Sequence, residues 1–123
     1  MKLHLSDAPG KNLFTGYGED YVLINGKRHE GSLIVLPGRV EPWKEGGVET
    51  LTAEDFARLA ALDVEIVLLG TGKQQRFPSP ALATVLPAAG IGLEVMDSGA
   101  ACRTYNILVA EGREVAAALI TEA

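Results

Sequence analysis

One short segment of the chain has residue types that could bind phosphate. An apolar run over residues 64–69 ends in a Gly-Thr-Gly-Lys motif at residues 70–73, and Arg76 follows. Glycine-rich loops that carry a lysine bind phosphate groups because their backbone amides and the ammonium group surround the anion. A nucleotide-binding loop is therefore the first chemical hypothesis.

The motif does not satisfy the requirements of a Walker A loop. Such a loop needs a glycine five positions before its second glycine, and a serine or threonine after its lysine to bind magnesium. Val67 and Gln74 stand at these two positions. The hypothesis of a P-loop nucleotide enzyme is therefore rejected.

The dinucleotide-binding motif Gly-x-Gly-x-x-Gly is also incomplete. Its third glycine is replaced by Gln75, and the following helix begins only near Pro80. Glu94 has about the spacing of an acidic ribose ligand, but the pyrophosphate-binding half of the motif is missing. We therefore expect no cofactor, and the two glycines are explained by a sharp turn at a strand end.

A weaker anion site is still compatible with the position of this loop. In parallel α/β sheets, ligands bind outside the carboxyl ends of the strands. If the strands over residues 64–69 and 92–96 are neighbours, loops 70–78 and 97–99 face one another. The candidate ligand-binding residues are Gly70, Thr71, Gly72, Lys73, Arg76, Asp97 and Ser98. The simpler interpretation, a solvated turn with surface charges, is favoured.

No catalytic or metal-binding residue is expected. Cys102 lies early in a helix but beside Tyr105 on its inner side, so a buried structural thiol is favoured over a reactive one. His4 and His29 are isolated, and no metal-ligand spacing exists around them. Ser98 lacks the surroundings of a nucleophile and is interpreted as a helix cap.

Composition excludes several classes of protein. The chain has 123 residues, which suits one domain over residues 1–123, and its net charge is −5 with no basic block. A nucleic-acid partner is therefore not expected. No apolar stretch approaches the ~20 residues of a membrane span, so membrane insertion is not expected either. The single cysteine and the absence of a visible signal peptide predict a cytoplasmic location.

The first half of the chain predicts a hairpin and a capped helix. We expect an irregular arm over residues 1–19, before a body over residues 20–123. A strand over residues 20–27 enters an Asn-Gly turn and is expected to pair with residues 31–36. Thr52 and Asp55 form the capping box of a short helix.

The second half alternates strands and helices. Strands are expected over residues 64–69, 92–96 and 114–120, with helices starting at Ser79 and Asp97 between them. Pro87 is expected to kink or shorten the last turn of the first of these helices. This β-α-β-α-β order predicts parallel strands, so the fold class is α/β, with a mixed sheet completed by the N-terminal antiparallel hairpin.

Two further side chains are candidates for contacts with other proteins. Trp43 lies in a proline-containing loop, where it either covers an edge of the core or anchors a partner. Arg103 points away from the inner face of its helix, toward solvent or an interface.

A set of residues in the second half resembles a known family. The residues that carry the resemblance are Gly70, Gly72, Gly90, Ile91, Glu94, Val95, Cys102, Tyr105, Asn106, Glu111, Gly112 and Arg113. They resemble the family of small α/β domains of unknown function that includes mitochondrial NADH dehydrogenase (complex I) assembly factor 3, and the chain looks like its bacterial Mth-like branch. The resemblance implies a three-layer β+α/β/α domain and no shared reaction or cofactor. The mitochondrial member acts by binding other proteins.

These observations lead to three functional hypotheses. The first is a non-catalytic protein-interaction domain, in particular an assembly factor for a respiratory or other membrane complex. The alternative is a small-molecule or anion-binding protein, with an enzyme as one form of it, that uses the crevice between loops 70–78 and 97–99. The third is a homo-oligomer formed through an exposed edge strand.

Overall fold

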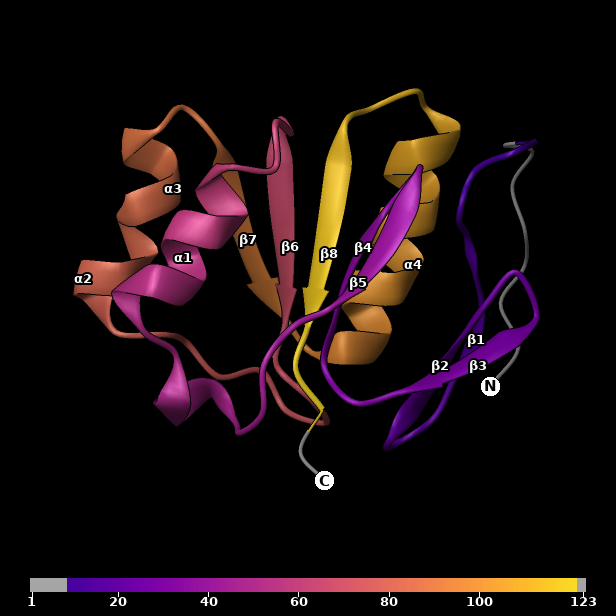
Figure 1. The fold of residues 1–123 in the computed structure, drawn as a ribbon, viewed down its shortest axis with the longest axis horizontal. Helices are drawn as coiled ribbons and strands as arrows, with labels where there is room; N and C mark the ends of the chain where they lie inside the picture. The colour runs from indigo at the N-terminus through magenta and orange to yellow at the C-terminus, as the bar shows by residue number, and fades with distance from the viewer. Residues whose placement is uncertain (1–8, 122–123) are drawn as a thin grey trace.

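A five-stranded mixed sheet forms the centre of the computed structural model, which describes residues 9–121 (Figure 1). In spatial order the strands are β5 (Arg39–Pro42), β4 (Leu33–Leu36), β8 (Val115–Leu119), β6 (Ile66–Gly70) and β7 (Gly92–Met96). β6 is parallel to both β7 and β8, whereas β4 is antiparallel to β8 and to β5. The parallel half expected from the sequence is confirmed.

Helices cover both faces of this sheet. One face carries α1 (Ala53–Ala60), α2 (Pro80–Ala83) and α3 (Val85–Ala88), with the 3-10 turn η1 (Val48–Thr50) before α1. The other face carries α4 (Ser98–Ala110) and a small antiparallel sheet of β1 (Phe14–Tyr17), β2 (Tyr21–Ile24) and β3 (Lys27–Glu30). The chain passes from β6 to the edge strand β7, and it then returns across β6 to β8, on the other side of β6. Right-handed crossovers then place their helices on opposite faces.

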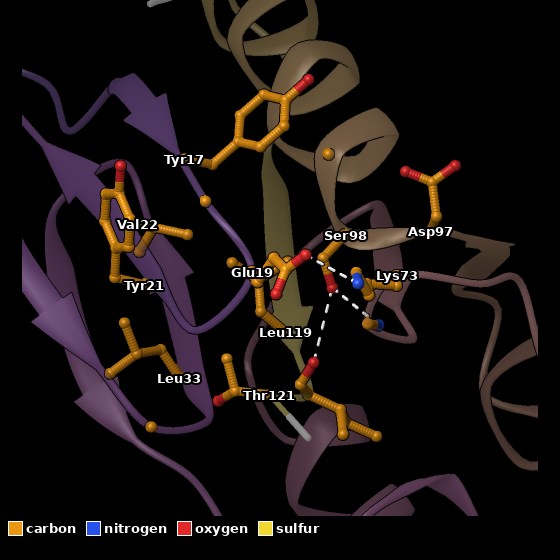
Figure 2. Close-up of a pocket in the computed structure, with 15 residues that line it drawn as sticks. Tyr17, Glu19, Tyr21, Val22, Leu33, Lys73, Asp97, Ser98, Leu119 and Thr121 are labelled. Atoms are coloured by element: carbon orange, nitrogen blue, oxygen red, sulfur yellow. Dashed lines mark hydrogen bonds and ion pairs between the residues drawn. The ribbon is translucent and has the colours of Figure 1, made fainter. Parts of the chain in front are cut away.

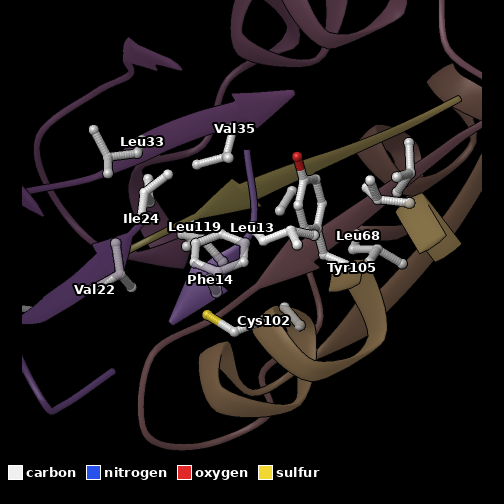
Figure 3. Packing of buried hydrophobic residues seen from close by; sticks show 14 residues of the cluster. Leu13, Phe14, Val22, Ile24, Leu33, Val35, Leu68, Cys102, Tyr105 and Leu119 are labelled. Atoms are coloured by element: carbon white, nitrogen blue, oxygen red, sulfur yellow. The ribbon is translucent and has the colours of Figure 1, made fainter. Parts of the chain in front are cut away.

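The core is therefore split by the sheet into two apolar layers, which confirms the three-layer β+α/β/α fold. β8 supplies both layers because its side chains alternate. Ala116 and Ala118 pack toward α1 and α3, whereas Val115, Ala117 and Leu119 pack toward α4 and the small sheet (Figure 3). Small residues on this central strand allow both layers to approach it closely.

The helix start predicted at Thr52 is confirmed. Thr52 Oγ1 accepts from the Asp55 amide at 3.2 Å, and Asp55 Oδ2 accepts from the Thr52 amide at 2.9 Å. Lys44 Nζ donates to the same carboxylate at 2.7 Å. The capping box and the lysine together anchor the start of α1.

The hairpin prediction was right about the turn and wrong about the partner strand. Asn25 and Gly26 turn with φ values of 50° and 82°, and β2 then pairs with β3. A two-residue turn returns the chain at once, so the partner begins at Lys27 and cannot wait until residues 31–36. Those residues contain β4 instead, whose four side chains are all buried, as expected of a strand covered on both faces.

Two further segments of the first half also form strands. Residues 14–17 of the expected irregular arm are β1, while residues 1–8 lie outside the described residues. Residues 39–42, part of the proline-containing loop expected around Trp43, are β5, which pairs with β4 at the sheet edge, where Pro42 is tolerated.

The helix expected to run from Ser79 is broken at Thr84 into α2 and α3. Pro87 lacks an amide hydrogen, and its ring would clash with the carbonyl of Ala83 in a continuous helix. The proline therefore interrupts the helix at Thr84, directly before the last turn that it was expected to kink or shorten.

Candidate functional site

The carboxyl ends of β6 and β7 bring the two expected loops into direct contact. Gly70 lies opposite Met96 in the parallel register, and the Thr71 amide donates to Met96 O at 2.9 Å. Beyond this pair, the Ser98 amide donates to Gly72 O and the Gly72 amide donates to Ser98 Oγ, both at 2.8 Å. The loops therefore touch each other, and no open space lies between residues 72 and 98.

Most polar groups of this region hold the loops in place. Thr71 is 1% exposed, and its hydroxyl donates to Gln74 O at 2.6 Å and accepts from the Arg76 amide at 3.0 Å. Asp97 Oδ1 caps α4 by accepting from the Ala100 amide at 2.9 Å. The threonine, aspartate and serine of the expected site thus have structural partners.

Gly70 and Gly72 are required to be glycine for two different structural reasons. A Cβ on Gly70 would lie 2.7 Å from Cδ2 of Leu119 and 3.1 Å from Cα of Ser98, so the close approach of β6 to the start of α4 excludes a side chain. Gly72 has φ of 91°, which favours glycine because other residues are strained there.

The two basic residues of the expected site lie at different places. Lys73 forms an ion pair with Glu19, with Nζ 2.6 Å from Oε1. The hydrogen bond to Glu19 and its negative charge raise the pKa of Lys73. Arg76 instead lines a separate concavity with Lys44 and Glu49. The structure therefore brings Gly72, Lys73, Asp97 and Ser98 around one space and leaves Arg76 outside it.

That space is a cavity of about 280 Å³ between the small sheet and the carboxyl ends of β6 and β8 (Figure 2). Its floor is apolar and consists of Val22, Leu33 and Leu119. The ion pair between Lys73 and Glu19 lies beside it. An apolar floor with a few polar groups at its rim is the usual composition of a small-molecule site.

Two tyrosines form walls of the cavity and rest on glycines. A Cβ on Gly99 would lie 2.7 Å from Cε1 of Tyr17, and a Cβ on Gly18 would collide with the ring of Tyr21. The Arg103 guanidinium lies 5.9 Å from the centroid of the Tyr17 ring, and Arg103 also donates to the Tyr17 hydroxyl. These contacts fix the ring of Tyr17 and the position of Arg103.

Sequence reasoning missed most of the contribution of residues 17–33 to this cavity. Tyr17, Glu19 and Tyr21 fall in or next to the segment expected as an irregular arm. The apolar run Tyr21–Ile24 is a local signal for a strand and was expected as one within residues 20–27, but nothing in the run indicates which residues cover it. No local signal pairs Glu19 with Lys73.

Trp43 and Cys102 are both part of the packing. The Trp43 side chain is half-buried against the layer that contains α1, and its indole nitrogen is buried without a hydrogen-bond partner. Trp43 therefore covers an edge of the core, one of the two roles expected for it. Cys102 is fully buried, and burial raises the pKa of its thiol to about 12. The prediction of a buried structural thiol is confirmed.

Within residues 9–121, no group of three His, Cys, Asp or Glu side chains could hold a metal ion. Over the same described range, no helix has the length and apolar character needed to cross a bilayer.

The fold and the cavity define a three-layer α/β domain with a mixed sheet and a small antiparallel sheet packed on one face. Over residues 14–120 the chain matches the family described as a protein of unknown function (DUF498/DUF598). The chain therefore belongs to this family, which confirms the resemblance seen in the sequence.

Known relatives and solved structures agree with this assignment. NADH dehydrogenase (ubiquinone) 1 alpha subcomplex assembly factor 3 of Bos taurus is 34% identical over 116 residues, which are 93% of this chain and 63% of the relative. The chain thus spans less than two thirds of that relative's length. A crystal structure of a Bordetella parapertussis protein is 38% identical with a TM-score of 0.85, covering 94% of this chain and 100% of the other. A Mth938-like domain from Bordetella pertussis is 34% identical with a TM-score of 0.80, covering 98% and 92%.

Proposed function

We propose that this chain is a non-catalytic protein-interaction domain that helps to assemble a membrane complex, and that the complex is the respiratory NADH dehydrogenase. The observation that carries the proposal is the similarity to assembly factor 3, which extends over 93% of this chain. A similarity of this extent covers all three layers of the fold, so a shared binding surface is a reasonable expectation. The proposal includes the cytoplasmic location expected from the sequence.

The geometry of the strand ends supports a role without catalysis. The hydroxyl groups of Thr71 and Ser98 form hydrogen bonds with backbone groups, and the Cys102 thiol is buried with a raised pKa. A nucleophile needs an accessible group with a neighbouring base. These three side chains do not meet that requirement.

An exposed aromatic side chain offers a place to test partner binding. Phe77 is 72% exposed and lies beside Pro78 and Leu82 along a shallow concavity. Aromatic residues are enriched in the centres of protein–protein interfaces. Ile107 on α4 is 55% exposed and serves as a matched control on the opposite face of the sheet.

The experiment is deletion of the gene in its own host, followed by native-gel analysis of NADH dehydrogenase and by NADH oxidation in isolated membranes. We expect loss of the assembled complex and its restoration by the wild-type gene. Phe77→Ser, at a normal protein level, is expected to restore less complex than Ile107→Ser. An unchanged amount of complex in the deletion strain would contradict the proposal.

Two other hypotheses are separate from this proposal. The hypothesis of a small-molecule or anion-binding protein is tested at the cavity of Figure 2. Self-association through an edge strand is tested by light scattering of the purified chain. The edge strands of the central sheet are β5 and β7, and Gln75 Nε2 covers one carbonyl of β7 by donating to Val95 O at 2.9 Å.

A further inference from the structure

The cavity beside Lys73 combines an apolar floor with a single cation at its mouth. Val22, Leu33 and Leu119 form the floor and are only 7%, 6% and 3% exposed, so the floor continues into the core. Among the described residues that line the cavity, Lys73 is the one basic side chain. The Asp97 carboxylate points away from the cavity (Figure 2), and its Oδ1 accepts from the Ala100 amide at the start of α4.

The cation at the mouth and the carboxylate that it binds both extend from loops that main-chain hydrogen bonds hold in place. Lys73 follows Gly72, whose amide and carbonyl both bond to Ser98. Glu19 lies on the turn between β1 and β2, where the Gly18 amide donates to Tyr21 O at 2.9 Å. The side chains of Lys73 and Glu19 are 67% and 75% exposed, and exposed ion pairs contribute little to stability. An external carboxylate can therefore replace Glu19 at small cost.

We propose that the cavity binds a small molecule with a compact apolar body that ends in a carboxylate. The carboxylate takes the place of Glu19 on Lys73, and the body covers Val22, Leu33 and Leu119. The volume of about 280 Å³ is just below the roughly 300–1,000 Å³ typical of drug-sized ligands, so the occupant is small. One lysine matches one negative charge, which favours a carboxylate over a phosphate because a phosphate needs several donors. This inference is independent of the role in assembly.

Two sources share this chemistry: a free carboxylic acid and the C-terminal apolar residue of a peptide. Octanoate represents the first source and N-acetyl-leucine the second. Octylamine and N-acetyl-leucinamide keep the apolar bodies and remove the negative charge. Whichever carboxylate binds more tightly identifies the better source.

The experiment is titration of the purified full chain with these four probes, followed by amide chemical shifts and calorimetry. We expect both carboxylates to shift the amides of Leu33 and Leu119 and the two uncharged or cationic probes to leave them in place. Lys73→Gln is expected to weaken carboxylate binding by roughly a few-fold, because the attraction of an exposed cation is lost. Glu19→Gln is expected to strengthen it by a few-fold, because the internal competitor is removed.

Arg113→Gln is the matched control, since Arg113 also forms an exposed ion pair, with Glu65 at 3.2 Å, away from the cavity. The Arg113→Gln variant is expected to bind octanoate with the same affinity as the wild type. Lys73 is exposed, so its substitution leaves the fold intact. The proposal is overturned if neither carboxylate binds, if the amine and amide bind equally well, or if Lys73→Gln binds octanoate like the wild type.

Discussion

Asn106 is the side chain whose removal is expected to weaken the fold most specifically. It lies on α4 with 4% exposure, and its amide bonds both main-chain groups of Phe14 on β1. Oδ1 accepts from the Phe14 amide at 2.9 Å, and Nδ2 donates to Phe14 O at 2.8 Å. These two buried hydrogen bonds attach the small sheet to the helix.

Replacing Asn106 with alanine leaves both main-chain groups of Phe14 without partners inside the core. Each buried polar group without a partner costs about 1–3 kcal/mol, so Asn106→Ala is expected to lower the free energy of unfolding by about 2–6 kcal/mol. Small domains have only about 5–15 kcal/mol in total. The substitution is therefore expected to consume a large part of the stability of the protein.

The assay is urea unfolding followed by circular dichroism and by the fluorescence of Trp43, the single tryptophan. The urea concentration at the unfolding midpoint is expected to fall, while the slope of the free energy of unfolding against urea concentration stays the same. Gln75→Ala is the control, because Gln75 also donates an amide hydrogen to a strand carbonyl, but at the surface. Surface substitutions of this kind change stability by about 0.5 kcal/mol or less.

A second variant separates the loss of the hydrogen bonds from the loss of side-chain packing. Asn106→Asp has almost the same volume, keeps an acceptor for the Phe14 amide and loses the donor to Phe14 O. Its stability is expected to rise on acidification, because a protonated carboxyl group can donate again. The stabilising role of Asn106 is refuted if Asn106→Ala lowers the free energy of unfolding by less than about 1 kcal/mol, or by no more than Gln75→Ala does.

The remaining predictions concern the start of α1 and the buried thiol. Thr52→Ala removes one half of the capping box and is expected to cost about 0.5–2 kcal/mol in urea unfolding, whereas an unchanged midpoint would contradict the capping role. Burial raises the pKa of Asp55, but hydrogen bonds from Lys44 and Thr52 outweigh it, so that pKa lies below the ordinary 3.8. The stabilisation from Asp55 is therefore complete well above pH 3.8 and is lost as the pH falls through the lower, folded-state pKa. Acid titration of stability is accordingly expected to be flatter for Asp55→Asn than for the wild type, and equal slopes would reject this reasoning. Because the pKa of Cys102 is raised to about 12, its thiol is expected not to react with a disulfide reagent at pH 8 until the protein is unfolded, and rapid reaction of the native protein would show an accessible thiol.

The features that the sequence predicted correctly depend on close neighbours along the chain. The capping box of Thr52 and Asp55 involves residues three positions apart, and the Asn25-Gly26 turn involves two adjacent residues. The parallel half followed from the alternation of apolar runs with capped helices, because connection handedness leaves few arrangements. These signals are local, so they can be interpreted without knowing where the rest of the chain lies.

The features that the sequence missed depend on residues far apart. Whether residues 33–36 belong to a hairpin or to the central sheet is decided by β8, which pairs with them from the other end of the chain.

The sequence by itself determined the class of fold, the start of α1, the turn at Asn25 and the burial of Cys102. Only the tertiary structure decided that Lys73 meets Glu19, that Arg76 lies elsewhere and that Asn106 holds β1. The physical reason is the strand order β5-β4-β8-β6-β7, in which the last strand of the chain lies between the two halves. That insertion joins the two halves of the sheet, and the turn between β1 and β2 lies over the carboxyl ends of β6 and β8, which creates the cavity.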